Sequence, residues 1–249
     1  MSKVLTIARR EMAGYFFSPL AYVIGAMFLC AVAFKFAPPP AFWTGSREWF
    51  ILVPHQQASF RALFEMMGVA MIVAAPLLTM RLISEEYHSG TIETLMTAPV
   101  TDVQVVLGKF VGVFVFYLAL LGGTLIFLVL MLFFASPDPG VVVMGYLGMI
   151  LLGAAFLAVG VFASTLTRYQ LLAAAAAIVI LAALTLLSEP LAAHSPEPWN
   201  EIAARLSAMT YLRSFARGLF DTRGVVFFLS ITGGFLFLST KTLESRRWR

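Results

Sequence analysis

Long runs of apolar residues alternate with short polar stretches along this chain of 249 residues. A helix needs about 20 mostly apolar residues to cross the hydrocarbon core of a bilayer. The runs therefore predict an all-α, polytopic integral membrane protein with six transmembrane helices. The predicted spans are Leu20–Phe36, Leu63–Met80, Val105–Phe134, Val141–Leu166, Leu171–Leu187 and Val225–Thr240.

Composition supports lipid as the main solvent of the chain. Charged residues make up 12% of the sequence, whereas soluble domains carry about 25%. Mean hydropathy is +0.90. Six spans and their short connections leave no room for a soluble catalytic domain of ordinary size, about 100 residues or more. Residues 1–249 are therefore expected to form a single transmembrane domain.

Residues 1–18, before the first span, are predicted to form an interfacial amphipathic helix. Val4, Ala8, Met12 and Tyr15 recur at the spacing of one helical face, and basic and small residues lie opposite. Such a helix rests in the membrane interface with its basic side toward anionic headgroups.

The connection before the last span, residues 189–222, is too polar to cross the membrane and too apolar for an ordinary loop. We expect an extracytoplasmic re-entrant segment with short helices at Trp199–Leu206 and Tyr211–Leu219. Turns between such helices can lie at membrane depth only where other protein segments cover them.

Basic residues cluster beside the first and last spans. Because the cytoplasmic flanks of spans carry an excess of Lys and Arg, both termini are predicted to lie in the cytoplasm. The same placement explains the formal net charge of +4 without a nucleic-acid partner, since no basic stripe interleaved with aromatic residues is present. The two clusters are Lys3, Arg9 and Arg10, and Arg246, Arg247 and Arg249.

The chain lacks the motifs of a nucleotide-binding or metal-dependent enzyme. Gly108-Lys109 is not a phosphate-binding loop, because Val103 stands where that motif has its first glycine and no hydroxyl residue follows the lysine. The three histidines fall in different connections, without metal-ligand spacing. We therefore expect no catalytic residues, no metal site and no cofactor bound by this chain.

Residues 81–100 form the most polar stretch between two predicted spans and carry two opposed faces. These faces suit a docking helix, in which apolar anchors seat in a partner's groove and charges set the register. A helix lying on lipid is the alternative, but an acidic face matches anionic headgroups poorly. The acidic face comprises Glu85, Glu86 and Glu93, and the apolar face comprises Leu82, Ile83, Ile92, Leu95 and Met96.

The start of the third span carries two local signals. Thr101 and Gln104 have the spacing of a capping box, in which each side chain bonds the other's backbone N–H group. Gly108 and Gly112 stand four residues apart, a spacing that lets helices pack closely in a bilayer. In a span that contains several glycines, this spacing is equally compatible with chance.

Taken in order along the chain, these motifs resemble the permeases of type-2 ABC exporters. The most specific part runs from Ser84–Glu86 to Leu107–Lys109, and the resemblance covers essentially the whole chain. Three later stretches are similar to the gliding-motility permease subfamily, a label that many bacteria carry without gliding. They are Ser214–Arg223, Phe227–Ser230 and Leu243–Trp248.

The resemblance implies a permease subunit in a bacterial plasma membrane, coupled to a separate cytoplasmic ATPase dimer that binds ATP and magnesium. A second copy of the chain, or a related permease, would complete the membrane unit. The complex would export a lipid-like, glycan or hydrophobic cargo. Alternatively, it would transmit mechanical work to an extracytoplasmic machine or auxiliary protein without moving cargo. A membrane-embedded enzyme or a scaffold is a weaker interpretation.

Residues 81–100 then correspond to the coupling segment by which such permeases bind their ATPase subunits. Closure of the ATPase dimer on ATP would push this segment and rock the spans, because ATP binds the closed dimer preferentially. Within the segment, the resemblance places ATPase docking at Ser84, Glu85, Glu86, Ser89, Gly90, Thr91 and Glu93.

Overall fold

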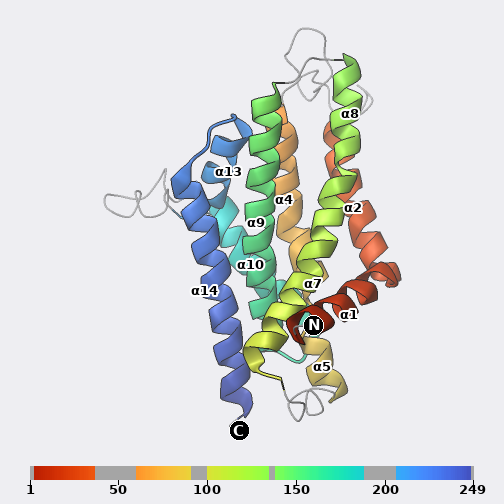
Figure 1. The fold of residues 1–249 in the computed structure, drawn as a ribbon, viewed down its shortest axis with the longest axis vertical. Helices are drawn as coiled ribbons and strands as arrows, with labels where there is room; N and C mark the ends of the chain where they lie inside the picture. Colours follow the sequence, from red (N-terminus) through yellow and green to blue (C-terminus); the bar gives the residue numbers. More distant parts are fainter. Residues whose placement is uncertain (1–2, 37–59, 91–99, 135–137, 188–205, 248–249) are drawn as a thin grey trace.

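The computed structural model describes residues 3–36, 60–90, 100–134, 138–187 and 206–247, and these residues form helices without any strand (Figure 1). The elements are α1 (Lys3–Phe16), α2 (Pro19–Phe36), α4 (Phe60–Thr79), α5 (Ser84–Ser89), α7 (Asp102–Gly123), α8 (Leu125–Phe134), α9 (Pro139–Leu166), α10 (Gln170–Ala182), the π-helix η2 (Ala183–Leu187), α13 (Ala208–Ala216) and α14 (Thr222–Arg247).

The long helices lie side by side in a bundle, and α9 packs against α4, α7, α10, α13 and α14. Most residues of α9 between Leu152 and Thr165 are buried. Glycines of α9 let larger side chains of α4 and α7 approach its backbone, which is how small residues favour close packing in membrane bundles. The contacts pair Phe64 with Gly145, Tyr117 with Gly153, and Thr79 with Gly160.

Four helices of the described chain are long and apolar enough to cross a membrane. A fifth is added if α1 and α2, which meet at a bend of 72°, are counted as one span. The helix at Gln170–Leu186 is apolar but shorter. All six apolar runs thus form helices, yet the number of six spans is not confirmed. These four candidate spans are Phe60–Ser89, which takes α4 and α5 together, Asp102–Leu130, which takes α7 with the first part of α8, Pro139–Leu166 and Thr222–Ser245.

α1 crosses α7 instead of following the bundle axis (Figure 1). Ala8 is buried, and the backbone of α1 runs against Gly108 and Gly112 of α7. A methyl group added at Gly108 would lie 2.7 Å from the Cβ atom of Ile7, and one at Gly112 would lie 2.7 Å from that of Glu11. Glycine at both positions is therefore what allows α1 and α7 to touch.

Side-chain caps fix the starts of α7 and α9. The predicted capping box is confirmed: Thr101 and Gln104 bond each other's backbone N–H groups, both at 3.3 Å, and α7 begins at Asp102. α9 begins at Pro139, because the preceding Asp138 accepts a backbone N–H of the first turn at 2.9 Å. A proline in the first turn needs no hydrogen-bond partner for its nitrogen.

The short helix predicted at Tyr211–Leu219 is found as α13, at Ala208–Ala216. It begins three residues early because Ser207 caps it, accepting a backbone N–H of the first turn at 3.3 Å. It ends before Gly218, whose φ of +79° turns the chain away. The other predicted helix, Trp199–Leu206, lies outside the described residues except for its last residue.

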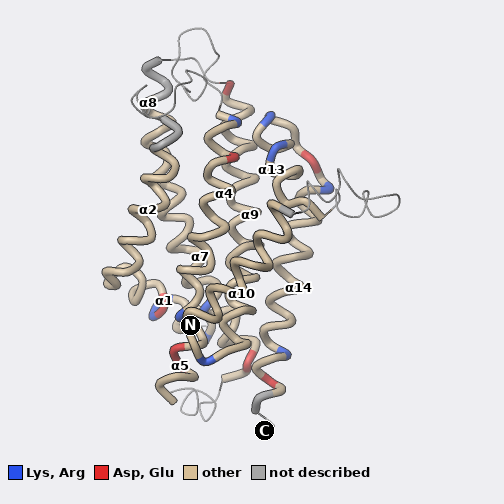
Figure 2. The backbone as a smooth tube through the Cα atoms, turned by 180° about the vertical axis from the view of Figure 1, so that it is seen from behind, with Lys and Arg blue, Asp and Glu red and all other residues tan. Residues whose placement is uncertain are grey.

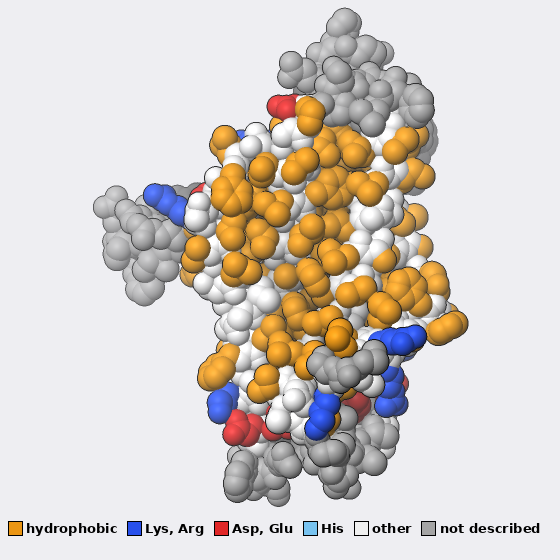
Figure 3. Space-filling model, viewed as in Figure 1, with side chains coloured by type: hydrophobic (Ala, Val, Ile, Leu, Met, Phe, Trp, Pro, Cys, Tyr) orange, Lys and Arg blue, Asp and Glu red, His pale blue; other side chains and the backbone are white. Residues whose placement is uncertain are grey.

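Lys, Arg, Asp and Glu residues of the described chain lie toward the two ends of the bundle (Figure 2). On the face shown in Figure 3, apolar side chains form a broad belt between the charged ends. One end holds α1, α5 and the last turns of α14, and the other holds α13 and the starts of α4 and α9. We call them the α5 end and the α13 end. This distribution is that of an integral membrane protein, whose middle meets hydrocarbon.

Candidate functional site

α5 is a helix of six residues at the α5 end, joined to α4 by a short turn. It stops at Ser89 because Gly90 takes a left-handed conformation, with a φ of +73°. Glycine adopts this conformation without steric cost, and it commonly ends helices. The Ser89 hydroxyl also donates to the Glu85 carbonyl at 2.8 Å. These two residues therefore fix where α5 ends.

The start of α5 is bonded to α9 through Ser164. The Ser164 hydroxyl accepts the backbone N–H of Ile83 at 3.0 Å and that of Ser84 at 3.1 Å, and it donates to the Met80 carbonyl at 3.3 Å. The Ser84 hydroxyl donates to the same carbonyl. The Ile83, Ser84 and Ser164 side chains are all buried. α9 thus holds the start of α5 through neutral groups alone.

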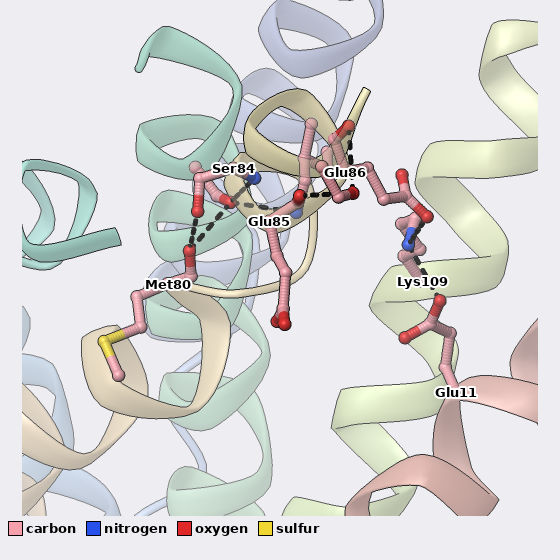
Figure 4. A network of polar contacts seen from close by, with 9 residues as sticks. Glu11, Met80, Ser84, Glu85, Glu86 and Lys109 are labelled. Atoms are coloured by element: carbon pink, nitrogen blue, oxygen red, sulfur yellow. Dashed lines mark hydrogen bonds and ion pairs between the residues drawn. The ribbon is translucent and has the colours of Figure 1, made fainter. Parts of the chain in front are cut away.

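Lys109 of α7 lies between two carboxylates that come from different helices (Figure 4). Its ammonium nitrogen is 2.7 Å from Oε1 of Glu11, on α1, and 2.7 Å from Oε1 of Glu86, on α5. The Lys109 side chain is 3% exposed, and each glutamate side chain is 25% exposed. We call these three residues the Lys109 cluster. A single cation therefore joins α1, α5 and α7.

The Lys109 cluster contains one more acid than base. Burial raises the pKa of Glu86 above its ordinary value of 4.5, while the charge and the hydrogen bond of Lys109 oppose this rise. Glu11 adds repulsion, and Arg10 adds attraction. Oε2 of Glu86 is buried and accepts no hydrogen bond within the described residues. The partial burial of Glu86 thus has a cost for its charged form that Lys109 only partly offsets.

Tyr15 fastens the last turn of α1 to the bundle. Its hydroxyl donates to the Leu78 carbonyl, in the last turn of α4, at 2.7 Å. Its ring stacks on that of Phe116 of α7, with 5.3 Å between ring centroids. Burial raises the pKa of this hydroxyl far above its usual range, so it remains a donor. Together with the glycine contacts of α7, this bond brings the α1 carboxylate within reach of Lys109.

A cavity of about 260 Å³ opens between α1, α5 and α7. Its wall includes the Lys109 cluster and Tyr15, together with Arg81 and Glu85, which are exposed. In the part of the chain that the structure describes, no three His, Cys, Asp or Glu side chains are placed to hold a metal ion. The described contacts around this cavity join helices to one another by charge and by hydrogen bonds.

The residues predicted to dock an ATPase separate into an outer and an inner group. Glu85, Ser89 and Gly90 are exposed on α5. Ser84 is fully buried, and Glu86 points inward to its lysine partner on α7 (Figure 4). Two further predicted docking residues lie outside the described part of the chain. They are Thr91 and Glu93.

The predicted apolar docking face is wrong for the residues that the structure describes. Leu82 and Ile83 are buried and belong to the core of this chain. They lie in the turn between α4 and α5, which has to be buried for Ser164 to bond its backbone. The rest of the predicted face falls outside the described residues. It comprises Ile92, Leu95 and Met96.

The sequence pattern gives no partner on another helix for Glu11, Lys109 or Ser164. Lys109 ends the Leu107–Lys109 motif of the resemblance, but nothing in that motif pairs it with an acid. A usable signal is that it stands alone inside the start of an apolar span, where an unpaired charge is costly and needs an acid partner. Ser164 offers no such signal, because a serine within a helix often bonds its own backbone.

Comparison with known proteins identifies the family. Residues 17–221 match the family model described as ABC-2 family transporter protein. A search of curated proteins gave no match. The matched region runs from α2 to α13 and includes α5 with its partners on α7 and α9. Because it covers more than half of the 249 residues, the chain belongs to the ABC-2 family of transporter proteins.

Proposed function

We propose that this chain is the permease of an exporter, in which ATP hydrolysis by a separate subunit drives a cargo out of the cytoplasm. The ABC-2 family consists of membrane permease subunits, which act with an ABC ATPase subunit and are typically not catalytic themselves. The observation that carries the proposal is the set of contacts that attach α5 to the rest of the bundle. Through Lys109 and Ser164, this partly exposed helix is connected to α1, α7 and α9. A force applied to α5 is therefore passed on to helices of the bundle.

In this proposal the α5 end faces the cytoplasm, and six spans cross the membrane. Both described chain ends lie toward the α5 end, which supports cytoplasmic termini (Figure 1). α2 has 18 residues and the helix at Gln170–Leu186 has 17, so they reach about 27 and 26 Å at about 1.5 Å per residue. These lengths approach the hydrocarbon thickness of about 30 Å. α13 then lies on the extracytoplasmic side, as part of the re-entrant segment.

We place ATPase docking on the exposed side of α5 and on the residues that follow it. An acidic surface suits a basic groove on the partner, where charges set orientation and association rate. Ser84 and Glu86 support the docking helix from inside, because the first is buried and the second pairs with Lys109. The proposed docking residues are Glu85, Ser89, Gly90, Thr91 and Glu93.

The proposed complex contains an ATPase dimer, which binds ATP and magnesium, and either a second copy of this chain or a related permease. Gly108 and Gly112 contribute helix packing within the chain, against α1. The alternative function, mechanical transmission to an extracytoplasmic machine or auxiliary protein, would use the same α5 contacts. A place in the gliding-motility subfamily belongs with that alternative. The two functions differ in whether cargo crosses the membrane.

Purification of the chain from its native host, with identification of the co-purifying chains, is the first test. We expect an ATPase subunit, and we expect no ATP hydrolysis by the purified chain alone. The complex is then reconstituted in lipid vesicles with ATP and a labelled lipid or glycan. Movement of the label supports export. Hydrolysis that depends on this chain without such movement supports the mechanical alternative, and a complex without any ATPase contradicts both.

Glu85→Lys tests the docking surface without disturbing the Lys109 cluster. If Glu85 faces a basic groove, the reversal creates repulsion and weakens ATPase binding by about 2–5 kcal/mol for a buried contact. If Glu85 merely faces water, the change stays within about 0.5 kcal/mol. Glu86 is unsuitable for this test, because Glu86→Lys would set a second cation against Lys109.

Glu244→Lys is the matched control for this docking test. Glu244 is an exposed glutamate near the end of α14, and its described ion-pair partner is Lys241 on the same helix, at 2.7 Å. The measurement is recovery of the ATPase subunit with the tagged permease, normalised to the membrane level of each variant. Equal recovery by both variants would remove Glu85 from the docking surface.

A further inference from the structure

Ser164 uses the whole hydrogen-bonding capacity of its hydroxyl on the junction between α4 and α5. A serine hydroxyl offers one donor and two acceptor positions. Both acceptor positions are occupied by backbone N–H groups, of Ile83 at 3.0 Å and Ser84 at 3.1 Å, and the donor is directed to the Met80 carbonyl at 3.3 Å. Serine in a helix often bonds its own backbone instead. Here the hydroxyl serves a segment 80 residues away in sequence.

α5 depends on this contact because it has no side-chain cap of its own. Its N-cap residue is Ile83, which makes no side-chain cap hydrogen bond. The first N–H groups of any helix need acceptors, and those of Ile83 and Ser84 belong to buried residues. A helix of six residues is also too short to be stable alone. Its direction is therefore set by α9 at its start and by Lys109 along its side.

α9 extends from this contact to the α13 end. Close to α5, Gly160 lets Thr79 of α4 lie against the α9 backbone. Toward the α13 end, Gly148 lies so near α13 that an added methyl group would be 2.7 Å from the Phe215 Cβ atom. No side chain of α9 intervenes at either glycine. Because packed interiors transmit strain, a displacement of α9 is passed on to its neighbours at both ends.

We propose that α9 transmits movement of α5 to α13, and that Ser164 is the positioning residue that joins α5 to α9. The proposal rests on the proposed function, in which an ATPase pushes α5, and it adds the route of the signal. One branch enters α7 through the ion pairs of Lys109. The other enters α9 through the hydrogen bonds that the Ser164 hydroxyl makes with Ile83, Ser84 and Met80.

Hydrogen exchange of the purified chain in lipid nanodiscs tests the link without any partner. Ser164→Ala removes the acceptor of two buried N–H groups, so we expect the amides of Ile83 and Ser84 to exchange about tenfold faster. Ser239→Ala is the matched control, because Ser239 is equally buried but donates to the Phe235 carbonyl of its own helix at 2.7 Å. Unchanged exchange at Ile83 and Ser84 in Ser164→Ala overturns the proposal.

A thiol label near α13 tests the transmission itself. The reporter is Leu219→Cys, at an exposed position just after α13, in a background where Cys30 is replaced by serine. In the complex with its ATPase, we expect ATP to change the rate at which Leu219→Cys reacts with a maleimide. Ser164→Ala should abolish this change at saturating ATPase, and Ser239→Ala should retain it.

The outcomes separate the inference from the proposed function. A response that persists in Ser164→Ala at saturating ATPase overturns the route through Ser164. A wild-type complex that hydrolyses ATP without any response at Leu219→Cys overturns transmission to α13 and leaves the proposed function intact. A wild-type chain that binds no ATPase removes the proposed function and the transmission together. The exchange experiment then still decides whether Ser164 positions α5.

Discussion

The two ends of the bundle each carry a cluster of three charged residues, and the clusters are opposite in composition. At the α5 end, one lysine lies between two glutamates. At the α13 end, Glu65 of α4 lies 3.0 Å from Arg61 of the same helix and 3.3 Å from Arg213 of α13. We call this second set the Glu65 cluster. Its side chains are 31% to 43% exposed, whereas Lys109 is 3% exposed.

Exposure decides what each cluster does. An exposed ion pair contributes about 0–1 kcal/mol, because water solvates both charges when they separate. Removing one partner of a buried pair costs about 3–5 kcal/mol, because the other charge stays buried without compensation. Separating the charges of the Lys109 cluster is therefore costly. At the other end, α13 is held mainly by the packing of Leu212 and Phe215, which are fully buried, and the Glu65 cluster adds little to that packing.

This difference suits the transmission of movement that we propose, from the α5 end to the α13 end. If α5 could shift relative to the helices that it contacts, its movement would not reach them. Lys109 joins α5 to α1 and α7, and this attachment therefore favours transmission. In the proposal α13 has to move in response, and the weak ion pairs at the α13 end permit small shifts of α13. The prediction with the largest expected effect concerns the Lys109 cluster.

Lys109→Met removes the cation of the buried cluster and keeps most of its apolar stem. Glu11 and Glu86 then repel each other across a buried space. We expect the free energy of unfolding to fall by about 3–5 kcal/mol, toward the lower end because both carboxylates are partly exposed. Denaturant titration in detergent micelles measures the loss, and hydrogen exchange should show α1 opening first.

Lys241→Met is the control for this substitution. Lys241 pairs with Glu244 at 2.7 Å, but its side chain is 58% exposed, so the expected cost stays within about 1 kcal/mol. Similar losses for the two variants would show that burial of Lys109 has no bearing on stability. The contrast between the two ends of the bundle would then have no energetic basis.

The second prediction uses pH to single out Glu86. Its pKa is raised above 4.5 in the folded state, chiefly by burial, so the folded chain holds this proton more tightly than the unfolded chain. Stability from this group is therefore greatest below pH 4.5 and falls as pH rises to the raised pKa, above which it is constant. The other charged groups that act on Glu86 are Lys109, Glu11 and Arg10.

Glu86→Gln removes this titration while it keeps the shape of the side chain. The stability of wild type minus that of Glu86→Gln should decline with rising pH from 4.5 upward and then level off. Unfolding titrations of both proteins at a series of pH values measure this difference. A difference that stays constant, or grows with pH, would mean that Lys109 outweighs burial at Glu86.

Much of the fold follows from the sequence, because a chain in lipid has to satisfy its backbone hydrogen bonds within helices. Apolar runs therefore predict helices with little ambiguity. Helix starts were predictable where the cap is local, as at Thr101 before α7. The start of α13 was missed by three residues, because a single serine at position 207 is a weaker signal than a capping box. The number of spans depends on α1 and α2 and on a 17-residue helix, where length alone does not decide.

The sequence predicts a short helix after the second span but not the contacts that hold it. The acidic stretch 81–100 predicts a docking helix, and the structure has α5 there, with Glu85 exposed; docking itself stays a prediction. The attachments of that helix could not be read from local pattern, since Glu11 lies 98 residues from Lys109 and Ile83 lies 81 residues from Ser164. Pairings of this kind depend on how the helices are arranged in space. They explain why Leu82 and Ile83, expected in a partner's groove, are buried in this chain instead.

The smallest effect is expected at the Glu65 cluster. Glu65→Gln keeps an acceptor for Arg61 and Arg213 and removes the charge, so the free energy of unfolding should fall by about 0–1 kcal/mol. Leu212→Ala shows that the same assay detects a loosened α13. Leu212 is fully buried against α4, where Gly68 makes room for it, and its truncation should cost about 2–5 kcal/mol.

Hydrogen exchange of the α13 amides is the second measurement on these two variants. We expect faster exchange in Leu212→Ala and nearly unchanged exchange in Glu65→Gln, because apolar packing and not charge holds α13 in place. If Glu65→Gln cost as much as Lys109→Met, exposure would not separate the two clusters. The α13 end would then be held by charge as firmly as the α5 end, and a movable output at α13 would have no support in the energetics of its attachment.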